Sequence, residues 1–262
     1  MNFDPLQWVL AAVAAILVGV AKAGVSGIGI LPVAIYAQLV PAKQASGLLL
    51  PLLIVGDVFA VLSYRHHAQW RHLLRLVPWT AAGVVTGYLA MNRIDDRQAK
   101  VTIGAIILVL SAMQLWRRRS GAAQEPATHS AVTAAIFGII AGFTTLLANA
   151  AGPLMAIYLL AMRLPKLEFV GTAAMFFLVL NIFKVPFMAD LGLINLGSLG
   201  TNLWLMPAVV AGVFLGRKIV ARLNQRWFEN LSLALAVAAG VDRKSTRLNS
   251  SHIPLSRMPS SA

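Results

Sequence analysis

Long apolar runs recur along almost the whole chain, and they restrict the folds open to it. Several reach about 18 residues or more, which suffices to cross a hydrocarbon layer of ~30 Å as a helix. Only 12% of the 262 residues are charged and 58% are hydrophobic, whereas soluble domains average about 25% charged residues. We therefore predict an all-α, polytopic membrane protein that lies in the lipid bilayer and has no separate soluble domain.

The apolar segments form two halves with the same order of lengths: long, short, long, long, long. The segments are 6–24, 28–41, 45–64, 72–91 and 98–116 in the first half, and 130–148, 150–162, 168–189, 199–221 and 228–241 in the second. Residues 117–129 between the halves are polar and contain Pro and Gly, which is typical of a linker. We predict a first transmembrane repeat at 1–116 and a second at 130–241.

An offset of 124 residues aligns the two halves. It matches Pro41, Gly47 and Asp57 with Pro165, Gly171 and Asn181, and residues 24–28 with residues 148–152. Both of these last stretches interrupt an apolar helix. Two-fold repeats with helices broken in matching positions point to the binding site of a transporter. Chance similarity between two apolar helical halves is the alternative.

The C-terminal end departs from this pattern. Segment 228–241 would make only about 21 Å of helix, which is short for a bilayer. Residues 242–262 have no apolar periodicity and resemble translated adapter sequence. We expect this tail to be disordered and non-native and to replace the rest of a truncated last helix, with an ordinary polar tail as the alternative.

The first helix break is rich in glycine and contains one lysine. Gly24, Gly27 and Gly29 would let the chain turn and bring backbone N–H groups close to a ligand. Lys22 and Ser26 are spaced i,i+4 and would share a face if the helix continued that far. The short piece that follows would present a positive helix end, which suits an anion. The alternative to an anion site is that the small residues simply allow tight helix packing and that Lys22 extends to the membrane–water interface.

The second break carries hydroxyl and amide groups. Thr145 and Asn149 are also spaced i,i+4, and Thr144 lies beside them. Gly152 and Pro153 open the following short piece, and proline suits the first turn of a helix. Two facing breaks would supply donors to one anion from both halves.

Two further polar side chains lie within predicted spans. Asp57 is well inside 45–64, and a carboxylate near the centre of a bilayer tends to be functional or paired. It is a candidate for an ion pair with Lys22 or for a proton that couples transport. Its repeat counterpart, Asn181, is neutral. Lys184 precedes Pro186, and we expect it to extend to the membrane surface from a span end.

The two breaks and the repeated layout resemble the TauE/SafE sulfite exporter family over about residues 6–241. The resemblance implies an inner-membrane permease of bacteria, with about eight helices, for sulfite, sulfonates or related small anions. It implies that the central pathway is lined by Gly24, Ser26, Gly27, Asn149, Gly152 and Pro153. Ala150 and Ala151 stand where the family's glycine-rich form would have more glycine. The resemblance leaves the anion, the direction of transport and the oligomeric state open.

Other function classes fit the sequence less well. The stretch 24–27 matches the Gly-x-Ser-Gly of intramembrane serine proteases, but the histidines lie at loops, at span ends or in the tail, away from this serine. A cation or metal transporter would need more carboxylates or histidines inside the membrane than Asp57 alone. A purely structural membrane scaffold would not need matched breaks.

The net charge of +13 also has a membrane explanation, since the basic residues occupy short connections as they do in cytoplasmic loops. We therefore expect no nucleic-acid partner. From the residues inside the predicted spans we also expect no enzyme activity, no cofactor and no metal.

Overall fold

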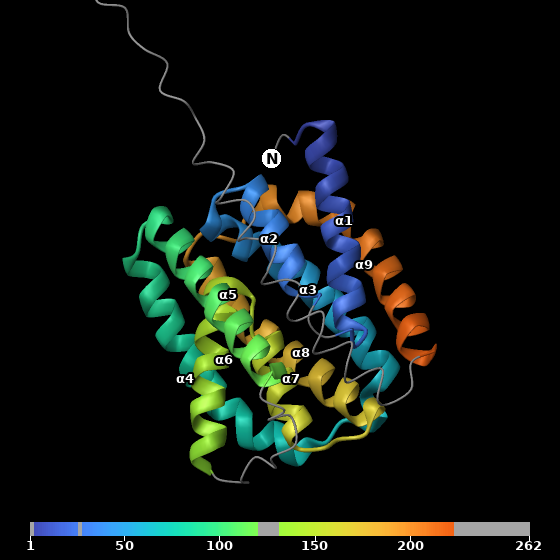
Figure 1. Ribbon diagram of the computed structural model, residues 1–262. Helices are drawn as coiled ribbons and strands as arrows, with labels where there is room; N and C mark the ends of the chain where they lie inside the picture. The colour runs from blue at the N-terminus through green and yellow to red at the C-terminus, as the bar shows by residue number, and fades with distance from the viewer. Residues whose placement is uncertain (1–2, 26–27, 120–130, 223–262) are drawn as a thin grey trace, which may run out of the picture.

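The computed structural model describes residues 3–25, 28–119 and 131–222, and in these ranges the chain is helical with no strand (Figure 1). The elements are α1 (Pro5–Lys22), α2 (Ile30–Leu39), α3 (Ala42–Tyr64), the short 3₁₀ helix η1 (Arg65–His67), α4 (Trp70–Arg93), α5 (Asp96–Arg119), α6 (Ala131–Ala148), α7 (Gly152–Ala161), α8 (Lys166–Asp190) and α9 (Leu196–Arg222).

The first nine predicted segments correspond one by one to α1–α9, with ends that differ by a few residues. One boundary is corrected, because Arg117, Arg118 and Arg119 continue α5 and do not begin the linker. Most of the linker, the segment 228–241 and the tail 242–262 lie outside the described residues.

Five described helices are long and apolar enough to cross a membrane: α1, α3 with η1, α4, α8 and α9. Shorter apolar stretches are α2 (Ile30–Leu39), Ala134–Ala148 within α6, and α7 (Gly152–Ala161). The expectation of about eight spans stays a prediction.

Helices from the two halves are interleaved (Figure 1). The central helix α3 of the first half packs on α8 of the second, α1 packs on α9, and α4 packs on α6. The short helix α2 packs on α1 and α3, and α7 packs on α6 and α8. The three most extensive helix contacts in the described ranges, α4–α6, α1–α9 and α3–α8, therefore each combine one helix from each half.

The two flanking pairs approach so closely that glycine is required at the contact. A Cβ atom on Gly19 of α1 would lie 2.0 Å from the Val209 carbonyl oxygen of α9, and one on Gly142 of α6 would lie 2.1 Å from the Thr80 carbonyl oxygen of α4. Small residues at such contacts let helix backbones pack tightly inside a membrane. The obstacle at each position is backbone, which cannot rotate away as a side chain can.

The Gly142→Ala variant should therefore be destabilised by about 1–3 kcal/mol or more, because α4 and α6 would have to move apart. Gly200→Ala in α9 is the matched control, since no atom beyond the neighbouring backbone of its own helix lies within 4 Å of the added methyl group. Unfolding of the two purified variants in detergent measures the difference. Equal stability of both variants would contradict the close α4–α6 contact.

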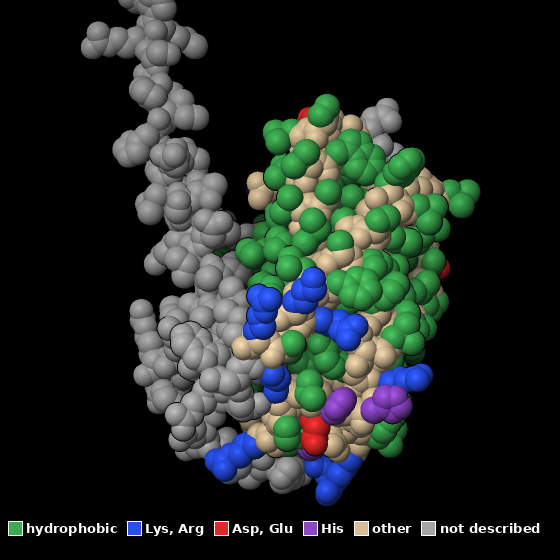
Figure 2. Space-filling view, turned by 90° about the vertical axis from the view of Figure 1, so that its right-hand side faces the viewer, with side chains coloured by type: hydrophobic (Ala, Val, Ile, Leu, Met, Phe, Trp, Pro, Cys, Tyr) green, Lys and Arg blue, Asp and Glu red, His purple; other side chains and the backbone are tan. Residues whose placement is uncertain are grey.

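The outer surface is apolar where lipid would lie. Large hydrophobic side chains such as Leu62, Leu203 and Trp204 are exposed, at 61%, 65% and 80%. Figure 2 shows hydrophobic side chains over the upper part of one face, with Lys, Arg and His gathered toward its lower end. This separation of hydrophobic and basic side chains is expected of a membrane protein, because Lys and Arg gather in the loops on one side of the bilayer.

Candidate functional site

A cavity of about 80 Å³ lies where the two helix breaks meet α3 and α8. A space of this size holds a few water molecules or a small ion. Polar and break residues on its wall are Lys22, Gly24, Gly29, Asp57, Thr145, Asn149, Gly152, Pro153 and Asn181. Both breaks therefore contribute to one cavity, although they are more than a hundred residues apart in the chain.

The first break begins directly after Lys22, where α1 ends. Gly24 has φ of 111°, and a Cβ atom there would lie 2.6 Å from Val170 Cγ2 of α8, so glycine is needed for both conformation and space. The helix α1 ends at Lys22, so the condition under which Lys22 and Ser26 would share a helix face is not met. Ser26 and Gly27 lie outside the described residues.

The second break turns at Asn149, which follows the end of α6 and has φ of 50°. Its backbone N–H donates to the Thr145 carbonyl at 3.0 Å, and its side-chain Nδ2 donates to the Ser46 carbonyl of α3 at 2.9 Å. Asn is among the residues that tolerate this left-handed conformation. The chain resumes as α7 at Gly152, with Pro153 in the first turn.

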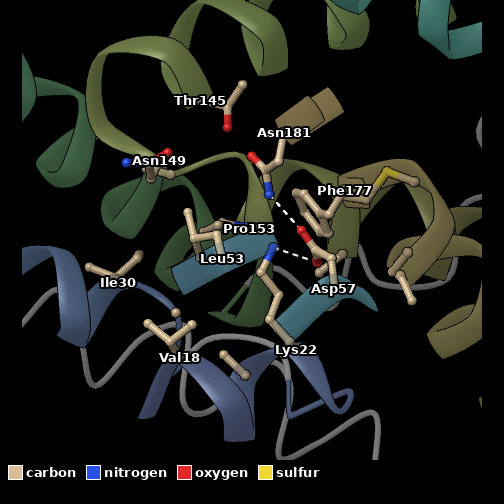
Figure 3. Close-up of a pocket in the computed structure, with 18 of the residues that line it drawn as sticks. Val18, Lys22, Ile30, Leu53, Asp57, Thr145, Asn149, Pro153, Phe177 and Asn181 are labelled. Atoms are coloured by element: carbon tan, nitrogen blue, oxygen red, sulfur yellow. Dashed lines mark hydrogen bonds and ion pairs between the residues drawn. The ribbon is translucent and has the colours of Figure 1, made fainter. Parts of the chain in front are cut away.

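Lys22 and Asp57 form an ion pair on the cavity wall, with 2.8 Å between Nζ and Oδ1 (Figure 3). The Asp57 side chain is fully buried and that of Lys22 is 10% exposed. The Lys22 ammonium also lies 4.4 Å from the centre of the Phe177 ring, within the range of a cation–π contact. The other carboxylate oxygen, Asp57 Oδ2, accepts a hydrogen bond from Asn181 Nδ2 at 2.6 Å.

Lys184 is completely buried, and our expectation that it reaches the membrane surface is wrong. The helix α8 continues through Pro186 to Asp190, so Lys184 is not at a helix end. Its Nζ donates to four oxygens: Asn149 Oδ1 at 2.6 Å, Asn181 Oδ1 at 3.0 Å, Thr145 O at 3.0 Å and Thr145 Oγ1 at 3.3 Å. The i,i+3 spacing from Asn181 was the available signal, because it places both side chains on one helix face.

Ser46 is a second residue that the sequence analysis missed. It is buried, its Oγ donates to the Leu146 carbonyl at 3.0 Å, and the same oxygen accepts from Asn149 Nδ2 at 3.2 Å. It thus ties α3 to the second break. We call the connected residues Lys22, Ser46, Asp57, Thr145, Asn149, Asn181 and Lys184 the buried polar network.

A family model described as "Sulfite exporter TauE/SafE" matches residues 10–242. The chain belongs to this family. No curated protein and no solved structure matches it. Together with its long apolar helices, the TauE/SafE assignment makes it a multi-pass membrane transport protein.

One predicted residue of this TauE/SafE site lies away from the cavity, and the described residues give no support to the serine-protease or metal-transporter alternatives. Thr144 does not line the cavity. Its hydroxyl donates to the Ile140 carbonyl of its own helix at 2.8 Å. No histidine is among the described residues of the cavity wall, so the cavity adds no support for a serine protease. Within the described ranges no group of three His, Asp or Glu side chains could hold a metal.

Proposed function

We propose that this protein is a permease or exporter of sulfite, sulfonates or similar small anions in the bacterial inner membrane, and that the anion binds in the cavity between the two helix breaks. The observation that carries the proposal is the meeting of both breaks at one cavity, with the ammonium of Lys22 on its wall. Irregular backbone at membrane depth is tolerated where it lines a cavity or is buried in protein.

The helices that restart after the breaks would add positive potential. The first residues of α2 and α7, including Ile30, Gly152 and Pro153, line the cavity. The free N–H groups at a helix N-terminus favour an anion. Asp57 would hold Lys22 in place, and it is the carboxylate on the described wall that could carry a proton during transport.

The packing supports a pseudo-two-fold relation between the halves. With the offset of 124 residues, α1 corresponds to α6 and α4 to α9, so the α1–α9 pair corresponds to the α6–α4 pair. The central helices α3 and α8 correspond to each other, and the matched residues Asp57 and Asn181 are in direct contact. We infer that the cavity lies near the pseudo-axis, where one half could rock against the other to alternate access.

Efflux of labelled sulfite and methanesulfonate from vesicles containing the purified protein tests this function. Lys22→Met should lower the flux at least about tenfold, since an ammonium-to-anion hydrogen bond of about 1.5–3 kcal/mol is lost. Asn149→Ala should also lower it, because the second break loses its contact with α3.

Lys100→Met removes an exposed lysine of α5 that does not line the cavity, and it serves as the control with unchanged flux. Undiminished flux in both site variants would remove the cavity as the binding site. Absence of flux for every small anion would overturn the proposed function itself.

A further inference from the structure

A second pocket lies where α9 ends beside the end of α3 and the beginning of α8. Its volume is about 450 Å³, which falls within the range of ~300–1,000 Å³ of sites for small molecules. The polar side chains on its described wall are Tyr64, Lys166, Arg217 and Lys218. None of them lines the central cavity, so this pocket is separate from the anion site proposed above.

The described wall of this pocket is basic. Three of its side chains are cationic, and no Asp or Glu is among its described residues. Lys166 is held in place, because its Nζ donates to the Val220 carbonyl near the end of α9 at 3.0 Å. Arg217 and Lys218 are exposed, and Arg217 makes a side-chain hydrogen bond with Tyr64, which is also on the wall. The pocket therefore favours an anionic ligand.

The beginning of α8 adds hydrogen-bond donors to the same wall. Lys166 and Leu167 are the first two residues of this helix, and both line the pocket. Pro165 precedes them and its side chain makes no capping hydrogen bond. The first N–H groups of a helix have no partner within the helix, and they suit the oxygens of a phosphate group.

The rest of the wall is apolar and is continuous with the surface that lipid would cover. Leu167 and Phe214 line the pocket and are 41% and 52% exposed. Beside them, Leu215 of α9 is 49% exposed. A free phosphate ion would use only the basic side chains, whereas an amphiphilic molecule would contact both parts of the wall. The pocket therefore fits a phospholipid better than a soluble anion.

The pocket is at the basic end of the molecule. Tyr64 is the last residue of α3, and η1 (Arg65–His67) follows it directly, at the end where Lys, Arg and His gather in Figure 2. A Cβ atom on Gly171 of α8 would lie 2.6 Å from the Tyr64 carbonyl oxygen, so α8 begins beside the same end. The positive-inside rule places such an end at the cytoplasm, where the membrane leaflet carries anionic phospholipids.

We propose that this pocket binds the headgroup of an anionic phospholipid of the cytoplasmic leaflet. The phosphodiester lies between the Lys166, Arg217 and Lys218 side chains, and the acyl chains run over Phe214. Basic pockets between transmembrane helices on this side of a membrane bind anionic headgroups.

Native mass spectrometry of the purified full chain tests the proposal with phosphatidylglycerol and phosphatidylcholine of identical acyl chains. The first lipid is anionic and the second has no net charge. One phosphatidylglycerol should bind with a Kd at least about tenfold below that of phosphatidylcholine, because each Lys or Arg strengthens the attraction of an anionic lipid about fivefold. Equal affinity for the two lipids would overturn the proposal.

A pair of double variants locates the binding. Arg217→Gln with Lys218→Gln should weaken phosphatidylglycerol binding at least about tenfold. The matched control is Arg93→Gln with Arg97→Gln, which removes two exposed arginines that do not line the pocket. Arg93 is the repeat counterpart of Arg217 at the offset of 124 residues, and the control should bind as the unaltered protein does. An equal loss in both variants would show an effect of net charge alone and would overturn the site.

Glycerol 1-phosphate separates a lipid from a soluble phosphate, because it carries the phosphate group without acyl chains. At the concentration of the lipid it should not displace bound phosphatidylglycerol. Displacement would make the ligand a soluble phosphate and would overturn the phospholipid. These measurements involve no transport, so a failure of anion efflux would leave this inference standing, and its own failure would leave the proposed function standing.

Discussion

The Asp57→Asn variant is expected to lose about 3–5 kcal/mol of its free energy of unfolding, because it leaves the Lys22 ammonium buried without a counter-charge. Lys22 is held at 2.8 Å from Asp57, and the side chains are 10% and 0% exposed. Lys22→Met should cost a similar amount, since it leaves the carboxylate unpaired. Unfolding of purified protein in detergent measures both losses.

The double variant Lys22→Met, Asp57→Asn should recover much of this stability, because neither charge remains. Replacing a buried ion pair as a whole is often close to neutral. Anion efflux should nevertheless stay at least about tenfold below that of the unaltered protein, since the ammonium on the cavity wall is gone. A double variant that loses the sum of the two single losses would show that the side chains act independently.

The helices could be predicted from the sequence because each combines a local signal with a local boundary. Apolar runs end at Gly, Pro or charged residues, and both Pro41 and Pro165 directly precede a long helix, α3 and α8. Prolines also mislead when they are inside a span. Pro186 lies within α8, where neighbouring helices can satisfy the backbone group it frees.

The site was predictable only in part, because its chemistry depends on contacts between helices distant in sequence. A pairing of Lys22 with Asp57 followed from the cost of a lone carboxylate in an apolar span. The environment of Lys184 did not follow, since its partners Thr145 and Asn149 come from another helix and the break after it. The role of Ser46 depends on the same packing, and a serine in an apolar helix has no distinguishing local signal.

Exchanging the two matched residues tests the network at its centre. In the variant Asp57→Asn, Asn181→Asp the 2.6 Å hydrogen bond between positions 57 and 181 can persist with donor and acceptor reversed, because carboxylate and amide have nearly the same shape. The carboxylate would then lie beside Lys184, whose Nζ is 3.0 Å from the oxygen of residue 181. The exchange should therefore be more stable than Asp57→Asn alone by about 3 kcal/mol, since a buried counter-charge is restored.

The exchange leaves the Lys22 ammonium on the cavity wall without its carboxylate partner at position 57. The total charge of the network is unchanged and Lys22 is kept, so labelled sulfite efflux should persist, unlike in Lys22→Met. Efflux of labelled sulfite from vesicles containing the variant measures this. If the exchange is as unstable as Asp57→Asn, position 181 cannot replace position 57 as the site of the charge, and the near-symmetry of the two central helices does not extend to their polar side chains.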